Sequence, residues 1–165
     1  MKENVNPIPK GYGTVTPSLV IQDCEGAIEF YKKALGAQEL MTMNGPDGNM
    51  VHAEIRIGNS ILMLNPEHGE HPGHDQNCPK TPSEMKGTTS SFYVYVEDAD
   101  AAYGRAISAG AKSVMPLTDM FWGDRMGNVQ DPYGYIWSIA THTKNPTPRE
   151  MEQGAKEFYA QTVAR

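Results

Sequence analysis

The feature that most constrains this sequence is a helix signal that occurs twice. The landmarks are Asp23, residues 24–35 and Gly36 in the first copy, and Asp98, residues 99–109 and Gly110 in the second. In each copy an aspartate suited to cap a helix precedes apolar residues at helical spacing, and a glycine suited to end the helix follows them. Asp98 lies 75 residues after Asp23, and Gly110 lies 74 residues after Gly36. The sequence therefore predicts one structural module that is used twice.

Each predicted helix is preceded by one strand-like segment and followed by three more. The predicted strands are residues 15–21, 39–43, 50–57 and 61–64 in the first copy, and residues 91–96, 113–117, 126–130 and 135–141 in the second. Turn signals rich in Pro, Asp, Asn and Gly separate several of them. A period of about 75 residues is too long for a solenoid, whose repeats span roughly 20–45 residues. We therefore predict an α+β fold of two βαβββ modules in a pseudo-twofold arrangement.

Two regions lie outside this repeat. Residues 65–86 are polar and contain four prolines, which predicts a long loop between the modules. Near the C-terminus, Thr147, Pro148 and Glu150 form a capping box with proline at the first helical position, and an apolar stripe follows. We expect one domain over residues 1–143, with modules at about 12–65 and 88–143 joined by the loop 65–87, and a helical tail over residues 144–165. Such a tail docks either on its own core or on a partner chain.

Charge and composition exclude several partners. The chain has 14 Lys and Arg residues against 20 Asp and Glu residues, for a formal net charge of −6, and its only basic cluster is Lys32-Lys33. This pattern gives no electrostatic footprint for nucleic acid. No apolar run approaches the roughly 20 residues that span a bilayer, and the N-terminus lacks a signal peptide. With two cysteines, we expect a cytoplasmic protein.

Two local motifs extend the repeat into a family resemblance. Phe30-Tyr31 follows Asp23 in the first helix, and a turn of sequence Asp-Pro-Tyr-Gly stands at residues 131–134. With the two βαβββ modules, these features resemble the vicinal oxygen chelate superfamily, which includes glyoxalase I, extradiol dioxygenases, fosfomycin-resistance enzymes and bleomycin-binding proteins. The resemblance spans about residues 12–143, and the stretch Phe-Trp-Gly-Asp-Arg-Met-Gly at residues 121–127 is similar to the PhnB-like branch.

This resemblance implies that the two sheets curl into a cup with the helices on its convex side, and that the protein is a homodimer. In metal-using members, His, Gln or Glu side chains from the first and fourth strands of each module hold a divalent ion in the cup. Spacing to the helix landmarks places these positions at Thr16, near Leu62, at Ser91 and at Ser138. Hydroxyl and leucine side chains are poor ligands for such an ion. We therefore predict no metal at the usual position and no cofactor.

Strand alternation then indicates which side chains line the cup. The predicted ligand-binding residues are Thr16, Ser18, His52, Glu54, Ser91, Tyr93, Tyr95, Trp122, Arg125 and Ser138. Tyr93 and Tyr95 are suited to form a wall that also offers hydrogen bonds. Trp122 lies beside Phe121 in a glycine-bounded loop, where it serves either to stack on a ligand or to dock on a partner subunit. Asp124 and Arg125 either recognise a polar ligand or form an ion pair that holds this loop.

The predicted strand 50–57 carries the candidate catalytic residues. His52, Glu54 and Arg56 share one of its faces, and apolar residues share the other. The functional interpretation makes His52 and Glu54 an acid–base pair and Arg56 an anion anchor. The plain structural interpretation is a polar face exposed to water.

A second arrangement offers metal-ligating chemistry. His68, His71 and His74 lie at three-residue spacing, with Cys78 nearby. Because this segment is rich in Pro and Gly, nothing holds the three imidazoles in place, so adventitious metal binding is the expected behaviour.

Three hypotheses of function follow. The first is a metal-independent protein that binds a small organic molecule, with Tyr93, Tyr95 and Trp122 as walls. The second is an enzyme of lyase, isomerase or dioxygenase type that depends on a metal or uses His52 and Glu54. The third is an accessory protein with a vestigial cavity.

Overall fold

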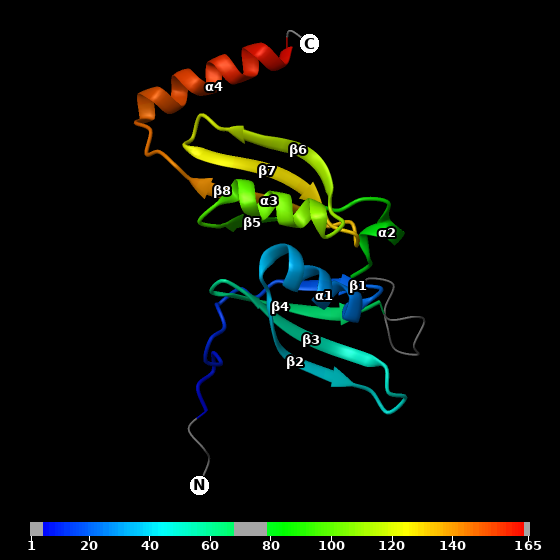
Figure 1. The fold of residues 1–165 in the computed structure, drawn as a ribbon. Coiled ribbons are helices and arrows are strands. Elements are labelled where there is room, and N and C mark those ends of the chain that lie inside the picture. Colours follow the sequence, from blue (N-terminus) through cyan, green and yellow to red (C-terminus); the bar gives the residue numbers. More distant parts are fainter. Residues whose placement is uncertain (1–4, 68–78, 164–165) are drawn as a thin grey trace. The chain divides into compact units, whose positions relative to one another are not determined.

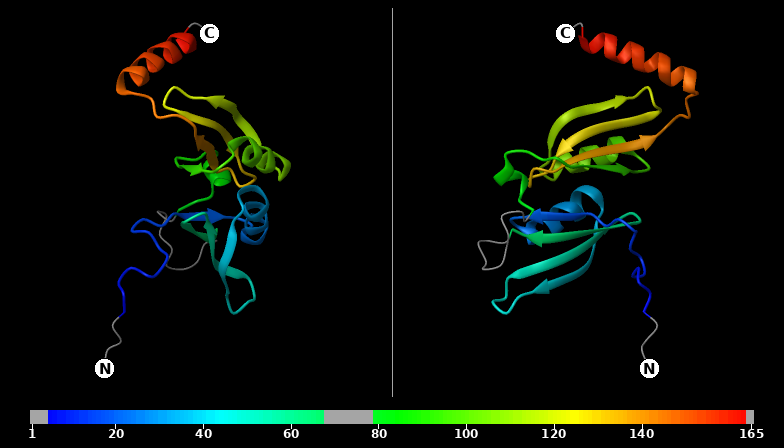
Figure 2. Two further views of the ribbon diagram at one scale, coloured as in Figure 1. Left: turned by 60° about the vertical axis from the view of Figure 1, so that its left-hand side comes forward. Right: turned by 180° about the vertical axis from the view of Figure 1, so that it is seen from behind.

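The computed structural model of this chain describes residues 5–67 and 79–163 and forms two compact units (Figure 1). Unit 1 comprises residues 1–88 and unit 2 comprises residues 89–165. Each unit contains one strand, one helix and then three strands, followed by a further helix (Figure 2). The predicted α+β class and the repeated βαβββ module are confirmed.

The elements of unit 1 are β1 (Ser18–Ile21), α1 (Cys24–Leu35), β2 (Gln38–Asn44), β3 (Met50–Ile57), β4 (Ser60–Pro66) and α2 (Pro82–Met85). Those of unit 2 are β5 (Ser91–Tyr95), α3 (Ala99–Ser108), β6 (Lys112–Asp119), β7 (Asp124–Gln130), β8 (Ile136–His142) and α4 (Pro148–Val163).

The two sheets have the same topology, and their two inner ladders have the same register. Their strand orders are β1-β4-β3-β2 and β5-β8-β7-β6, and in each sheet the first two strands are parallel and the others antiparallel. Leu64 pairs with Leu19 and Ala53 in unit 1, and the corresponding Ile139 pairs with Val94 and Gly127 in unit 2. The edge ladders differ, because β6 has one residue more than β2 in the stretch where each pairs with the middle of its neighbouring strand.

One face of each sheet packs against the helix of its unit, and there each core forms. In unit 1 the buried residues include Ala27 and Tyr31 of α1, and Leu19, Ile55 and Leu64 of the sheet. In unit 2 they are Ala102 and Ala106 of α3, and Val129, Trp137 and Ile139 of the sheet. We call the other side of each sheet its helix-distal face.

The helix ends follow the sequence signals. The side chain of Asp23 accepts a hydrogen bond from the N–H of Gly26 at 2.8 Å, and that of Asp98 accepts one from Ala101 at 2.9 Å. Gly36 ends α1 with a φ of 66°, in the left-handed region that glycine adopts without strain. At the start of α4, the predicted capping box is present, with the N–H of Thr147 donating to Glu150 at 2.7 Å.

Apart from shifts of one or two residues at the ends of elements, the structure differs from the sequence prediction in two places. Part of the predicted loop 65–86 is the short helix α2, whose N-cap Thr81 stands before Pro82 at the first helical position. The first strand begins at Ser18 rather than at residue 15, and Val15 is exposed. Pro17, which lacks an N–H, joins the sheet through its carbonyl oxygen, which accepts a hydrogen bond from Met63. None of the helices within the described residues is both long and apolar enough to cross a membrane.

Candidate functional site

The helix-distal face of unit 2 carries a cluster of polar and aromatic side chains around one buried carboxylate. Asp124, the first residue of β7, is 2% exposed. Its Oδ2 accepts hydrogen bonds from the hydroxyls of Tyr93 at 2.8 Å and Tyr95 at 3.1 Å. The indole N–H of Trp122 donates to the same oxygen at 3.1 Å, and His142 Nδ1 lies 2.7 Å from Oδ1. These side chains come from β5, β7, β8 and the turn before β7, so the sheet register assembles the cluster.

The cluster stabilises the ionised form of Asp124. Burial by itself raises the pKa of this carboxyl group, but the hydrogen bonds that it accepts outweigh burial and hold its pKa below the ordinary value. Burial and the bond to Asp124 raise the pKa of Tyr93 to about 12, and the bond to Asp124 raises the pKa of Tyr95. Both hydroxyls therefore stay protonated and keep donating to the carboxylate.

The tyrosine rings remain accessible although their hydroxyls are held. Tyr93 is 45% exposed and Tyr95 is 62% exposed, and their ring centroids lie 5.1 Å apart. Next to them on the same face is an apolar cluster formed by Met120, Met126 and Ala140, with Met115 and Trp122 packed against it. The result is an aromatic and apolar surface with a fixed anion at one side.

His142, the last residue of β8, extends the cluster toward the C-terminal linker. Its Nε2 lies 2.9 Å from Oδ1 of Asn145, and its side chain is 47% exposed. Hydrogen bonds to Asn145 and to Asp124 raise the pKa of His142 and favour the imidazolium form. Sequence reasoning missed the residue, although alternation from Ser138 and Ala140 along β8 places it on this face.

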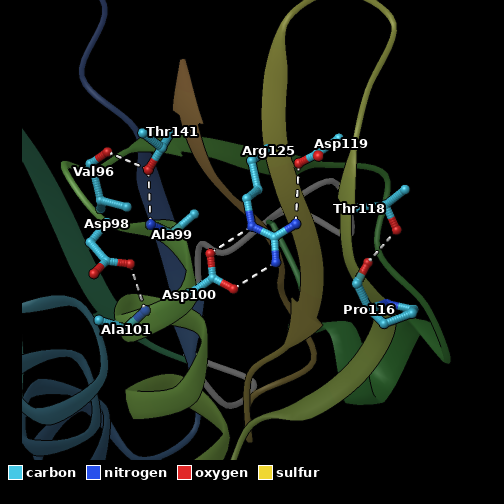
Figure 3. Close-up of polar contacts among 10 residues, drawn as sticks. All are labelled: Val96, Asp98, Ala99, Asp100, Ala101, Pro116, Thr118, Asp119, Arg125 and Thr141. Atoms are coloured by element: carbon cyan, nitrogen blue, oxygen red, sulfur yellow. Dashed lines mark hydrogen bonds and ion pairs between the residues drawn. The ribbon is translucent and has the colours of Figure 1, made fainter. Parts of the chain in front are cut away.

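Arg125 points to the other side of the sheet, toward α3 (Figure 3). Its Nε and Nη2 each lie 2.6 Å from a carboxylate oxygen of Asp100, and its Nη1 lies 3.1 Å from Asp119. These hydrogen bonds raise the pKa of the guanidinium group further above its ordinary value. The ion pairs of Arg125 join β7 to α3 and to the end of β6, whereas the neighbouring Asp124 pairs with His142.

The helix-distal face of unit 1 carries a different polar network. Glu54, 8% exposed, accepts a short hydrogen bond from the hydroxyl of Tyr12 and lies 3.4 Å from His52 Nε2. His52 Nδ1 lies 2.9 Å from the side-chain oxygen of Asn65, whose amide nitrogen donates to Ser18 Oγ at 2.8 Å. The hydrogen bond to Glu54 raises the pKa of Tyr12. Five side chains thus form one line from β1 across β4 to β3 and the N-terminal segment.

Within this network an imidazole lies beside a buried carboxylate. His52 Nε2 is 3.4 Å from Glu54 Oε1, and Asn65 holds the other nitrogen of the ring. An imidazole next to a carboxylate is a combination of groups that general acid–base catalysis uses.

The other predicted positions are distributed as follows. Thr16 precedes β1, and its hydroxyl donates to Gly13 at 3.4 Å. Ser91 begins β5, and Ser138 lies between Tyr93 and Asn128 in the ladder. Arg56 is exposed and donates to the side chain of Gln38.

The strand positions at which the resemblance implies a metal ion do not fit one. Leu62, where spacing placed the second ligand, lies on the helix side of β4 opposite Ile55 and is 4% exposed. The helix-distal residues that pair with one another on these strands are Ser18 with Met63 and Val20 with Asn65 in unit 1, and Tyr93 with Ser138 in unit 2. These neutral oxygen, thioether and alkyl groups do not make a ligand set for zinc, nickel or iron.

Across residues 5–67 and 79–163, no group of three or more His, Cys, Asp or Glu side chains is placed to hold a metal ion. The alternative set His68, His71 and His74 lies outside the described residues. Cys24 is buried in the first turn of α1, and burial raises the pKa of its thiol to about 11, so it is not activated as a nucleophile.

Comparison with known proteins relates this arrangement to one large family. The sequence profile described as Glyoxalase/Bleomycin resistance protein/Dioxygenase superfamily matches residues 13–139. The uncharacterized protein Mb0911c of Mycobacterium bovis is 38% identical over 152 residues, which is 92% of this chain and 94% of that protein.

Solved structures show the same architecture. TioX from Micromonospora sp. ML1 matches with a TM-score of 0.60 at 25% identity, covering 82% of this chain and 100% of TioX. A PhnB protein from Bacillus cereus matches with a TM-score of 0.59 at 19% identity, covering 78% of this chain and 99% of that one. At 19% identity, the similarity to the PhnB protein shows a shared fold alone.

Proposed function

This chain belongs to the glyoxalase/bleomycin resistance protein/dioxygenase superfamily, and from that premise we propose that it binds a small planar organic molecule on the helix-distal face of unit 2. The observation that carries the proposal is the Asp124 cluster. One buried carboxylate fixes two tyrosine hydroxyls and a tryptophan indole, while the tyrosine rings stay exposed. Aromatic walls held in place by hydrogen bonds lose little freedom on binding, which favours affinity.

The side chains on this face indicate the chemistry of the ligand. The rings of Tyr93 and Tyr95 and the apolar cluster next to them favour a planar, partly apolar molecule. Electron-rich ring faces attract positive charge, so a cationic aromatic compound suits the two exposed tyrosine rings better than an anionic one.

Titration with three aromatic compounds of different charge tests the proposal: proflavine, naphthol and anilinonaphthalene sulfonate. We expect proflavine to bind most tightly and the sulfonate most weakly, with NMR shift changes concentrated on β5, β7 and β8. If none of the three perturbs residues of this face, or if the changes fall only on unit 1, the proposal is wrong.

A pair of hydroxyl deletions provides the matched control. Tyr95→Phe removes one donor to Asp124, and we expect the affinity for proflavine to fall about fivefold, the equivalent of one hydrogen bond. Tyr103→Phe also removes one tyrosine hydroxyl from unit 2, but that hydroxyl belongs to α3 and contacts Ser113 and the carbonyl oxygen of Met115 rather than Asp124. The affinity of Tyr103→Phe for proflavine should equal that of the wild type. Equal losses in both variants would contradict the assignment of the site to this face.

The network in unit 1 favours a second candidate function, which is proton transfer by His52 and Glu54. Its support is the buried carboxylate bonded to an imidazole, with Arg56 two residues further along the same face of β3. In deuterium oxide, a working pair would accelerate hydrogen exchange in a small carboxylate-bearing carbonyl compound such as pyruvate, measured by NMR. Glu54→Gln should abolish this acceleration, and His142→Gln, which alters unit 2, should preserve it. Exchange no faster than in buffer alone would exclude this candidate for that compound class.

A further inference from the structure

We propose that α4 and its linker form part of the ligand site of unit 2, because they hold Trp122 and His142 in the positions from which both bind Asp124. This inference rests on the proposed function of that face. It assigns a positioning role to Gly154, Phe158 and Asn145, which lie outside the sheet that carries the site.

The linker that follows β8 lies against the turn that carries Trp122. The carbonyl oxygen of Gly123 accepts hydrogen bonds from the N–H of Thr143 at 2.8 Å and of Lys144 at 3.0 Å. Gly123 has a φ of 98°, and a Cβ at this position would overlap the carbonyl oxygen of Lys144 and lie 2.9 Å from Pro146 Cδ. The close approach therefore requires glycine next to Trp122.

The same linker holds the histidine. Asn145 lies 2.9 Å from His142 Nε2 through its side-chain oxygen, while Nδ1 of the same ring contacts Asp124. The imidazole is therefore held at both nitrogens, by the linker on one side and by the site carboxylate on the other. Displacement of the linker would release one of these two contacts.

The helix itself packs on Phe121, the neighbour of Trp122. A Cβ added at Gly154 of α4 would lie 2.5 Å from Cβ of Phe121, so the helix backbone approaches this residue as closely as glycine allows. The ring of Phe158, one turn further along, lies 5.9 Å from that of Phe121. Phe121 in turn meets Trp122 edge to face, with centroids 4.9 Å apart. The contacts thus run from α4 through Phe121 to the indole that donates to Asp124.

Gly154→Ala tests this inference, because the added methyl group cannot fit between α4 and Phe121, although alanine is the better helix former. Gly104→Ala in α3 is the matched control, since nothing lies within 4 Å of a Cβ at that position. The readout is the hydrogen-exchange rate of the Trp122 indole N–H, measured by NMR on the full chain without ligand. We expect exchange at least tenfold faster in Gly154→Ala and unchanged in Gly104→Ala. The indole of Trp137, which donates to Asp131 at 2.9 Å, is an internal reference that should not change in either variant.

Binding of proflavine supplies the second readout, and we expect it to weaken about tenfold in Gly154→Ala. Phe158→Ala removes the second contact without adding bulk, and it should change both readouts in the same direction. Unchanged indole exchange in both variants would overturn the inference, and so would unchanged affinity in variants whose indole exchange is faster. If the wild type binds none of the three compounds, the proposed function fails on its own, and indole exchange alone decides whether α4 holds Trp122.

Discussion

The buried carboxylate of unit 1, Glu54, lies in the middle of β3, whereas that of unit 2, Asp124, is the first residue of β7. The registers show that these are not equivalent positions. Met63 pairs with Ser18 and Glu54, and the corresponding Ser138 pairs with Tyr93 and Asn128. The position of Glu54 is therefore occupied by an asparagine in unit 2. The repeat conserves the backbone ladder and leaves the chemistry of each helix-distal face to be set separately.

The two units also differ in the sizes of the side chains that pack between helix and sheet. The fifth residue of the helix is Ile28 in α1 and Tyr103 in α3. On the neighbouring strand, Ala53 pairs with Leu64 in unit 1, and Gly127 pairs with the corresponding Ile139 in unit 2. A Cβ at Gly127 would lie 2.7 Å from the Tyr103 ring, so the larger helix residue faces the smaller strand residue. Two packing solutions on one scaffold keep the combined volume similar.

The largest expected effect is that of Asp124→Asn. The asparagine amide can keep its oxygen toward Tyr93, Tyr95 and Trp122, but its NH₂ group then faces His142 Nδ1. The ion pair with the imidazolium is lost, and the hydrogen bonds to the remaining oxygen are no longer strengthened by a negative charge. We expect the free energy of unfolding to fall by about 3 kcal/mol. Both tryptophans, Trp122 and Trp137, lie in unit 2, so tryptophan fluorescence during urea unfolding follows this unit.

Glu54→Gln is the corresponding change in unit 1 and sharpens the comparison. An amide oxygen can still accept from Tyr12 or from His52, so we expect a smaller loss of about 1 kcal/mol, followed by circular dichroism. If the two variants lost equal stability, the Asp124 cluster would be no more demanding than the network in unit 1.

Gly127→Ala should have an intermediate effect. Its methyl group would press on Tyr103 and on the carbonyl oxygen of Met115, and overpacking of this kind costs about 2 kcal/mol. The double variant Gly127→Ala/Tyr103→Ile copies the pair found in unit 1 and should recover most of the loss. Both are measured by urea unfolding with tryptophan fluorescence. A double variant as unstable as the single one would show that the two units do not compensate in this way.

The smallest effect concerns the pH dependence of unit 2. Because its hydrogen bonds to Asn145 and Asp124 raise the pKa of His142, the imidazolium adds stability that is complete below its unfolded pKa of about 6.5. This contribution is lost as the pH rises through the higher pKa of the folded state. The stability advantage of the wild type over His142→Gln should therefore be larger at about pH 6 than at about pH 9. If the difference in stability between the wild type and His142→Gln were constant over this range, the charge of His142 would contribute nothing to stability.

Much of the candidate site could be named from the sequence, while its centre could not. Alternation along the fifth predicted strand identified Tyr93 and Tyr95, and the glycine-bounded loop identified Trp122. Neither Asp124 nor His142 is among the predicted ligand-binding residues. Nothing in the local sequence indicates that a carboxylate will meet hydroxyls 31 and 29 residues away and an imidazole 18 residues away. These contacts depend on β8, which pairs with β5 on one side and with β7 on the other.

The sequence alone predicts the repeated βαβββ plan, because the signals that produce the plan act within a few residues. Aspartate caps, terminal glycines and the alternation of apolar residues set the helices and most strands, and α1 and β3 have the predicted bounds. Tertiary structure decided which residues meet across strands and where α4 lies. Register and close packing are collective properties, in which a single glycine at 127 or 154 matters through a neighbour distant in the sequence. The family could therefore be identified from the chain, while the Asp124 cluster required the fold.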